Sequence, residues 1–138
     1  MKHMFVDTSG WATLFDTDEP FHLEARTAVE SAREKGTRLV TTNYVIAELV
    51  ALMTSPFRVP RPQMIEYVNS LKTSASVDII NINAGLDDQA WDLLSNRTDK
   101  KWSLVDCSSF VLMKERDITD ALTNDHNFEQ AGFVRLLK

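Results

Sequence analysis

Short apolar segments alternate with longer stretches of helical spacing along this chain, and that alternation limits its fold more than any other feature. The apolar segments at 3–6, 38–41, 77–82, 121–123 and 133–136 are typical of strands. Between them, apolar residues recur three or four positions apart, which predicts helices over 11–15, 23–34, 44–53, 62–71, 86–94 and 104–114. Strands that alternate with helices favour right-handed crossovers and a mostly parallel sheet with helices on both faces. We therefore predict an α/β fold.

No feature of the sequence divides the chain into parts. Its 138 residues match the length of one ordinary domain, and no internal repeat, block of like charges or Pro/Gly/Ser-rich linker interrupts them. Hydrophobic residues make up 43% of the chain and charged residues 25%, which excludes an intrinsically disordered protein. We expect a single domain over residues 1–138.

The charge balance constrains the kind of partner that the chain can bind. A net charge of −5 excludes a global basic field that would draw the chain to nucleic acid or to an anionic membrane. A polyanionic partner must then be held by local basic patches or by bound cations. The best candidates for contact with phosphate are Arg58, Arg61, Arg97, Lys100 and Lys101.

Cysteine usage and hydropathy indicate the cellular compartment. The single cysteine, Cys107, excludes an internal disulfide and fits a reducing environment, where a small buried thiol is the simplest interpretation. No apolar run approaches the roughly 20 residues of a membrane span. The carboxylate of Asp7 also interrupts the N-terminal segment before a signal-peptide core can form. We expect a cytoplasmic protein with no membrane partner.

Acidic residues stand near the ends of several predicted strands. Asp7 follows the first strand, Asp125 comes just after the fourth, and Asp106 opens the last long helix. Glu48 lies in the middle of the helix that begins after the second strand. Ligands of open parallel sheets bind beyond the carboxyl ends of the strands. We therefore expect these four carboxylates to converge at one edge of the sheet.

Each of these acids also has a purely structural interpretation. Asp7 and Asp125 stand where aspartate caps a helix, and Ser103 with Asp106 matches the S-x-x-[DE] capping box. Glu48 has no basic residue three or four positions away, so it is either exposed or, if desolvated, held by a cation or a proton. Taken together, four acids with no thiolate partners and little histidine fit an oxygen-ligated Mg²⁺ or Mn²⁺ ion.

A carboxylate cluster of this kind supports metal-assisted phosphodiester hydrolysis, since a bound ion lowers the pKa of water and a second ion stabilises the leaving oxygen. Two other classes of function remain open. A phosphotransfer domain is the enzyme rival, but haloacid-dehalogenase-type phosphatases carry Asp-x-Asp after the first strand, and the second of those positions is Ser9 here. A binding module that kept the fold and lost catalysis is the other, and a metal-dependent RNA cleavage assay separates it from an enzyme.

Three stretches of the chain carry a resemblance to a known family. They are MFVDTSGW near the N-terminus, TTNYVIAELVALM in the middle and DKKWSLVDCSSFVLMKERDITDALTNDHNFEQAGF near the end. These stretches resemble the PIN-domain ribonucleases and, more narrowly, the VapC-type toxins of bacterial toxin–antitoxin pairs. The similarity runs from residue 5 to residue 136 and is weaker over 56–99.

The resemblance implies a Mg²⁺-dependent endoribonuclease, with Mn²⁺ as a substitute ion, that cuts structured RNA such as tRNA or rRNA. It also implies a cognate antitoxin protein and a homodimer. A housekeeping RNase of the same fold is the alternative, and a small adjacent gene for a DNA-binding protein would favour the toxin. The family's four acidic metal ligands and catalytic residues fall on Asp7, Glu48, Asp106 and Asp125, and supporting positions fall on Thr8, Ser9 and Thr123.

The chain departs from the family pattern just after the fourth predicted strand. Many relatives have an aromatic residue where this chain has Asn124, and a His-Phe pair where it has Asn127 and Phe128. Its histidine comes one place earlier, at His126. We therefore leave His126 outside the predicted core site.

Overall fold

A five-stranded sheet forms the centre of the computed structural model, which describes residues 2–138. The strands are β1 (His3–Val6), β2 (Arg38–Thr42), β3 (Val77–Ile80), β4 (Asp120–Leu122) and β5 (Val134–Arg135). All four pairings are parallel, and the spatial order is β3-β2-β1-β4-β5. The central strand β1 pairs through Phe5 with Val40 on one side and with Ala121 on the other.

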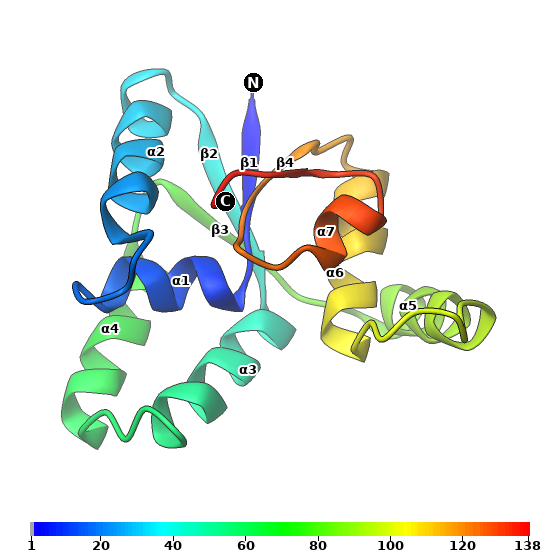
Figure 1. Ribbon diagram of the computed structural model, residues 1–138, viewed down its shortest axis with the longest axis horizontal. Coiled ribbons are helices and arrows are strands. Elements are labelled where there is room, and N and C mark those ends of the chain that lie inside the picture. The colour runs from blue at the N-terminus through cyan, green and yellow to red at the C-terminus, as the bar shows by residue number, and fades with distance from the viewer. Residues whose placement is uncertain (1) are drawn as a thin grey trace.

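Helices connect the strands and cover the sheet. In the described part of the chain they are α1 (Thr8–Phe15), α2 (His22–Glu34), α3 (Asn43–Thr54), α4 (Arg61–Thr73), α5 (Ala84–Asn96), α6 (Leu104–Glu115) and α7 (Asn127–Gln130). Figure 1 shows α1, α2 and α4 on one side of the strands and α5, α6 and α7 on the other, with α3 below the strand ends. The sheet is thus covered on both faces, as parallel sheets require.

The order of the strands reverses beside β1. The chain first moves outward from β1 to β2 and β3, and then returns to place β4 on the opposite side of β1. In open α/β sheets, ligands bind at such a reversal, beyond the carboxyl ends of the strands. The residues that follow β1 and β4 therefore lie where this architecture builds its sites.

An aromatic cluster joins the last two helices to the sheet. Phe128 of α7 is fully buried, and its ring meets that of Phe110 on α6 nearly edge to face, with centroids 4.9 Å apart. Phe128 also approaches Phe5 of β1, with centroids 6.3 Å apart. Burial of large rings in this geometry supplies much of the packing energy of a small domain. The cluster fixes α6 and α7 relative to β1.

The predicted α/β architecture is confirmed, and the sheet is entirely parallel. All five strands and six helices expected from the sequence are present with small shifts at their ends. β3 ends at Ile80 rather than at residue 82, because the Ile82 N–H donates to the side chain of Asn43 (2.6 Å) and Asn83 then caps α5. The helix that an aspartate cap at Asp125 implies is present as α7, but it has only four residues, and its N-cap is His126 rather than Asp125. Asp125 lies one residue too early, so its side chain closes a turn with the Asn127 N–H instead.

None of the helices described between residues 2 and 138 is long and apolar enough to cross a membrane.

Candidate active site

Asp7 is the most enclosed acid of the site. It follows β1 and caps α1, as predicted: its Oδ1 accepts from the Gly10 N–H (2.9 Å) and from the Ser9 hydroxyl (2.8 Å). Its Oδ2 accepts from the Thr123 hydroxyl (2.7 Å), which joins the ends of β1 and β4. Burial raises the pKa of Asp7 to about 7, and the charge of Asp125 adds to that rise, while the three hydrogen bonds lower it. The carboxylate is only 7% exposed.

Gly10 allows this close meeting of α1 and β4. A Cβ atom at Gly10 would lie 2.2 Å from the Leu122 carbonyl oxygen and 2.9 Å from Val6 Cγ1. The missing side chain therefore lets the first turn of α1 rest against the end of β4. As a result, the Ser9 hydroxyl lies 3.1 Å from that of Thr123 and accepts a hydrogen bond from the backbone N–H of Asn124 (3.1 Å).

Glu48 reaches the site from α3, which Thr42 caps by accepting from the Val45 N–H. The Glu48 carboxylate accepts a short hydrogen bond from the Thr8 hydroxyl (2.5 Å), so it is tied to the first turn of α1. The side chain is exposed to solvent. Of the two alternatives that the sequence leaves open, exposure of the Glu48 side chain is the one that the structure shows, with Thr8 as a neutral donor from another helix. Its role as a metal ligand stays a prediction.

Asp106 enters from the first turn of α6. The predicted capping box is confirmed: the Ser103 hydroxyl accepts from the Asp106 N–H (2.9 Å), and Asp106 Oδ2 accepts from the Ser103 N–H (3.1 Å). The same Oδ2 accepts from the side-chain amide of Asn127 (3.3 Å). Partial burial raises the pKa of Asp106, and the negative charge of Asp125 raises it further, although these hydrogen bonds lower it. Asp106 both caps the helix and faces the site.

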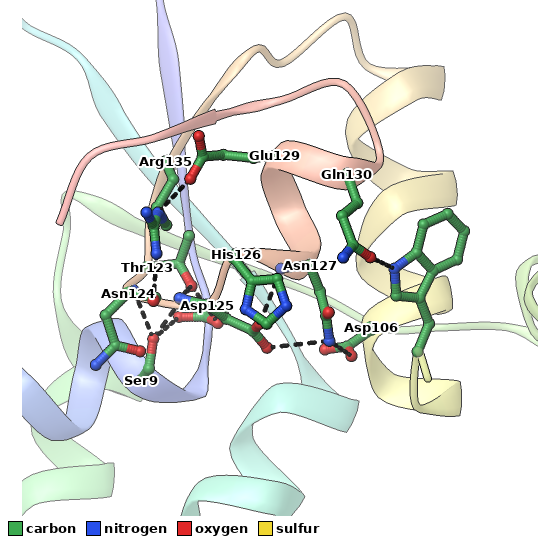
Figure 2. A network of polar contacts seen from close by, with 12 residues as sticks. Ser9, Asp106, Thr123, Asn124, Asp125, His126, Asn127, Glu129, Gln130 and Arg135 are labelled. Carbon is green, nitrogen blue, oxygen red and sulfur yellow. Dashed lines mark hydrogen bonds and ion pairs between the residues drawn. The ribbon is translucent and has the colours of Figure 1, made fainter. Parts of the chain in front are cut away.

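Asp125 follows β4 and begins the turn into α7. Its backbone N–H donates to the Thr123 hydroxyl (3.0 Å), and its Oδ1 accepts from the backbone N–H of Asn127 (2.9 Å). Figure 2 shows its carboxylate pointing toward Asn127 and Asp106. The neighbouring His126 is 70% exposed, with Nδ1 3.9 Å from Asp125 Oδ1. Thr123 thus supports both Asp7 and Asp125.

These side chains line one hollow of about 450 Å³, which we call the acidic hollow. Its lining residues are Asp7, Thr8, Ser9, Glu48, Leu52, Asp106, Asn124, Asp125 and His126. A larger cavity of about 530 Å³ lies between α5, α6 and α7, but Glu115 is the one acid on its wall among the residues that the structure describes. The four acids that the sequence analysis singles out all line the acidic hollow.

The acids meet at one hollow but do not form a ready-made metal centre. Within residues 2–138, no three His, Cys, Asp or Glu side chains come together as a group that could hold a metal ion. Asp7, Glu48 and Asp106 instead accept hydrogen bonds from their own neighbours. The donor set still fits a divalent cation, because carboxylate oxygens are what Mg²⁺ and Mn²⁺ take and no described lysine or arginine lines the hollow. The raised pKa of Asp7 marks a buried acid that a cation would stabilise as its anion.

The five basic candidates lie outside the acidic hollow. Arg97 pairs with Asp99 (3.0 Å) and lies over the ring of Trp102, with its guanidinium 5.1 Å from the ring centroid. Lys100 and Lys101 belong to the segment that leads into α6 and Asp106. Arg58 and Arg61 flank the start of α4. Their role in contact with phosphate stays a prediction.

Three residues in or beside the site escaped the sequence analysis. His126 was left outside the core site, yet it lines the hollow, and Asn124 was noted only as a departure from the family pattern. Asn127, another such departure, contacts both Asp106 and Asp125. The available signal was the run of polar residues around Asp125 directly after a buried strand.

An all-parallel sheet with acids gathered beyond β1 and β4 defines an open α/β domain with an acidic candidate site at the carboxyl ends of its strands, and the comparisons identify its family. The sequence model of the PIN domain family matches residues 4–134, so this chain belongs to the PIN domain family.

Relatives within this family are similar over nearly the whole chain. The chain is 30% identical over 133 residues to the 23S rRNA-specific endonuclease VapC20 of Mycobacterium tuberculosis, covering 96% of this chain and 97% of the relative in each of two strains. The crystal structure of VapC20, described as a Sarcin-Ricin loop cleaving toxin, matches with a TM-score of 0.84 and 29% identity over 95% of this chain and 96% of that one. FitAcB from Neisseria gonorrhoeae shares the fold alone, with a TM-score of 0.63 and 14% identity over 96% and 95% of the two chains.

Proposed function

We propose that this chain is a metal-dependent endoribonuclease that acts as the toxin of a toxin–antitoxin pair. The observation that carries the proposal is the acidic hollow, in which Asp7, Glu48, Asp106 and Asp125 meet on a chain similar along its length to a 23S rRNA-specific endonuclease. The same similarity supports a finer proposal, that the substrate is the sarcin–ricin loop of 23S rRNA rather than a tRNA.

The four acids would hold the divalent cation, Mg²⁺ or Mn²⁺. A bound ion supplies a Lewis acid for the phosphoryl oxygens and lowers the pKa of water, the two effects that phosphodiester hydrolysis needs most. The chain itself keeps the ligands in place: Thr123 and Ser9 hold Asp7, and Thr8 holds Glu48. These hydroxyl donors stabilise the carboxylates as anions where no lysine or arginine among residues 2–138 lines the hollow.

Contact with the RNA backbone falls to local basic groups, because the net charge of the chain is −5. Lys100 and Lys101 are the best placed of these, since they lead into the helix that carries Asp106. Arg97 is engaged with Asp99 and Trp102 and is the least available for phosphate. Arg58 and Arg61 would meet a more distant part of a folded RNA.

Cleavage of ribosomal RNA by purified protein tests the proposal. Wild-type protein should cut 23S rRNA in intact ribosomes at one position in the presence of Mn²⁺ or Mg²⁺ and should be silent in chelator, with the cut mapped by primer extension. Asp7→Asn and Asp106→Asn should reduce the rate by about a hundredfold to a thousandfold, because an amide keeps the shape of the side chain but loses the charge that holds the cation.

Asp88→Asn is the matched control, since Asp88 is an exposed acid on α5 outside the acidic hollow. This variant should cleave like the wild type. Cleavage by Asp7→Asn at the wild-type rate would place the chemistry elsewhere on the molecule. Cutting of tRNA with intact 23S rRNA would retain the nuclease and overturn the proposed substrate.

A cellular experiment tests the toxin role separately from the chemistry. Expression of the wild-type chain alone should arrest bacterial growth, and Asp106→Asn at matched protein levels should not. Co-expression of the small protein encoded beside this chain, the cognate antitoxin of the proposal, should restore growth. Equal growth with wild type and variant would remove the toxin role and leave the nuclease. Light scattering of the purified chain would test the proposed homodimer.

A further inference from the structure

We propose that Asn127 is a positioning residue that holds Asp106 and Asp125 together as one pair of metal ligands. The inference rests on the proposed function, because Asn127 contacts two of the acids that line the acidic hollow. It goes further because it assigns a role in cation affinity to a neutral amide. The family pattern has a different residue at this position.

The geometry around the Asn127 amide carries the proposal. Nδ2 lies 3.3 Å from Asp106 Oδ2 and 3.5 Å from Asp125 Oδ2, so one NH₂ group faces carboxylates from two different elements (Figure 2). A carboxamide nitrogen has two hydrogens and can donate one to each acid, whereas its oxygen in that place would repel both. An ionised carboxylate has about four lone-pair sites, so one contact to the amide leaves others of each acid for a cation.

The backbone of Asn127 strengthens the same link. Its N–H donates to Asp125 Oδ1 (2.9 Å), and the next N–H, that of Phe128, donates to the Asp125 carbonyl oxygen (3.2 Å). Asp125 is thereby held by the residue whose side chain reaches Asp106. Two like charges that face one hollow repel each other, and a donor placed between them offsets that repulsion without adding a charge of its own.

Packing on both sides keeps Asn127 in place. Phe128 is buried against Phe110, which lies one helical turn beyond Asp106 on α6. Gln130 accepts a hydrogen bond from Trp102 Nε1 (3.1 Å), just before α6 begins. The short helix α7 is therefore anchored to α6 at two points, and Asn127 lies at its first residue, directly beside Asp106. A ligand held by such an outer partner loses less freedom when the metal binds.

Calorimetric titration of Mn²⁺ into the metal-free protein, without RNA, tests this role directly. Asn127→Ala removes the amide, and Asn127→Leu replaces it with an apolar group of similar size. Both should raise the Mn²⁺ dissociation constant by about tenfold or more, the usual effect of losing a partner that orients metal ligands. Asn127→His, which keeps a side-chain N–H, should recover a large part of the affinity. Asn96→Ala, an exposed asparagine at the end of α5, is the matched control and should bind as wild type does.

RNA cleavage at varied Mn²⁺ concentration separates positioning from catalysis. In Asn127→Ala, the Mn²⁺ concentration needed for half-maximal cleavage should rise about as much as the dissociation constant, and kcat at saturating Mn²⁺ should stay near the wild-type value. Thermal melts in chelator identify any variant that fails to fold. If either Asn127→Ala or Asn127→Leu does so, the other substitution is compared with the wild type.

Each outcome of the titration bears on one proposal or on both. Wild-type affinity for Mn²⁺ in both Asn127→Ala and Asn127→Leu would overturn the positioning role and leave the proposed nuclease function intact. Equal Mn²⁺ dissociation constants for Asn127→Leu and Asn127→His would show that the side-chain N–H is not the basis of the positioning role. A wild-type protein that binds no Mn²⁺ would overturn the positioning role and the proposed metal dependence together, whereas Mn²⁺ binding that depends on Asn127 without RNA cleavage would overturn the nuclease alone.

Discussion

The two halves of the acidic hollow stabilise their carboxylates in different ways. On the strand side, Asp7 is buried and accepts three hydrogen bonds, from Gly10, Ser9 and Thr123. On the helix side, Asp106 and Asp125 are partly open to solvent and share a single amide donor. The strand half replaces water with fixed donors, whereas the helix half keeps part of its water.

The two halves therefore differ in the two requirements of a metal site, which are fixed orientation of the carboxylates and ease of their ionisation. A buried carboxylate is held in a fixed orientation, but its ionisation is unfavourable. The pKa of Asp7, raised by burial to about 7, reflects this free-energy cost. Partly solvated carboxylates ionise more easily but need a partner to keep them in position. The free-energy cost of ionising a buried acid therefore falls on Asp7, on the strand side. On the helix side, Asp106 and Asp125 depend on Asn127 for their relative position.

The largest expected effect concerns the ionisation of Asp7 in the metal-free protein. Its pKa is about 7 in the folded chain against 3.8 for the free side chain, so the folded state holds the proton more tightly than the unfolded state. That stabilisation is complete below pH 4 and is lost as the pH rises through 7. Asp7→Asn should match the wild type at pH 4 and should be more stable at pH 8, by up to roughly 4 kcal/mol.

Urea denaturation of both proteins in chelator between pH 4 and pH 9 measures this difference. Plotting the difference in unfolding free energy between variant and wild type removes contributions from other acids, such as Asp78, whose pKa Arg38 lowers. A difference that stays constant across the pH range would show that Asp7 is ionised at no cost. Addition of Mn²⁺ at pH 8 should stabilise the wild type and leave Asp7→Asn nearly unchanged.

The next effect in size tests whether the strand half depends on the contact between α1 and β4. Gly10→Ala would place a methyl group 2.2 Å from the Leu122 carbonyl oxygen, and neither backbone can move away without loss of the Asp7–Thr123 bond. We expect a destabilisation of about 3 kcal/mol or more, measured by thermal melting. Gly85→Ala is the matched control, since its methyl group would meet only Asn83 Oδ1, at 3.5 Å, and alanine favours the helix.

The smallest effect concerns the anchor of the helix half. Gln130→Ala removes the acceptor of Trp102 Nε1, and because Gln130 is exposed, water can replace part of the lost hydrogen bond. The unfolding free energy should fall by about 1 kcal/mol or less. The pH dependence assigned to Asp7 should not change, because that acid belongs to the other half. A change in it would show that the two halves are coupled through α7.

The fold was accessible from the sequence because its signals are local. Buried parallel strands appear as short apolar runs, and the helices between them are long enough to show their period. The end of β3 was missed because it depends on Asn43, a residue far away in sequence whose side chain captures the Ile82 N–H. The bounds of α7 could not be predicted, because packing of Phe128 in the core, rather than local periodicity, defines so short a helix.

The site was accessible in part. Strand order places Asp7 and Asp125 at one edge, and the capping signals of Asp7 and Asp106 describe their actual hydrogen bonds without excluding a place in the hollow. Glu48 shows the limit of such reasoning. Its helix contains no partner, but Thr8 supplies one from another element, and no pattern within α3 contains that information.

The bond between Asp7 and Thr123 also determines when the site can exist. Its two residues are separated by 116 positions, and β1 obtains its neighbour β4 only after residues 120–122 have been synthesised. During synthesis, an emerging chain thus carries Asp7 and Glu48 long before the residues that complete the hollow. A chain that has emerged only as far as β3 therefore carries two of the four acids without the hydroxyl of Thr123 that holds Asp7 in place.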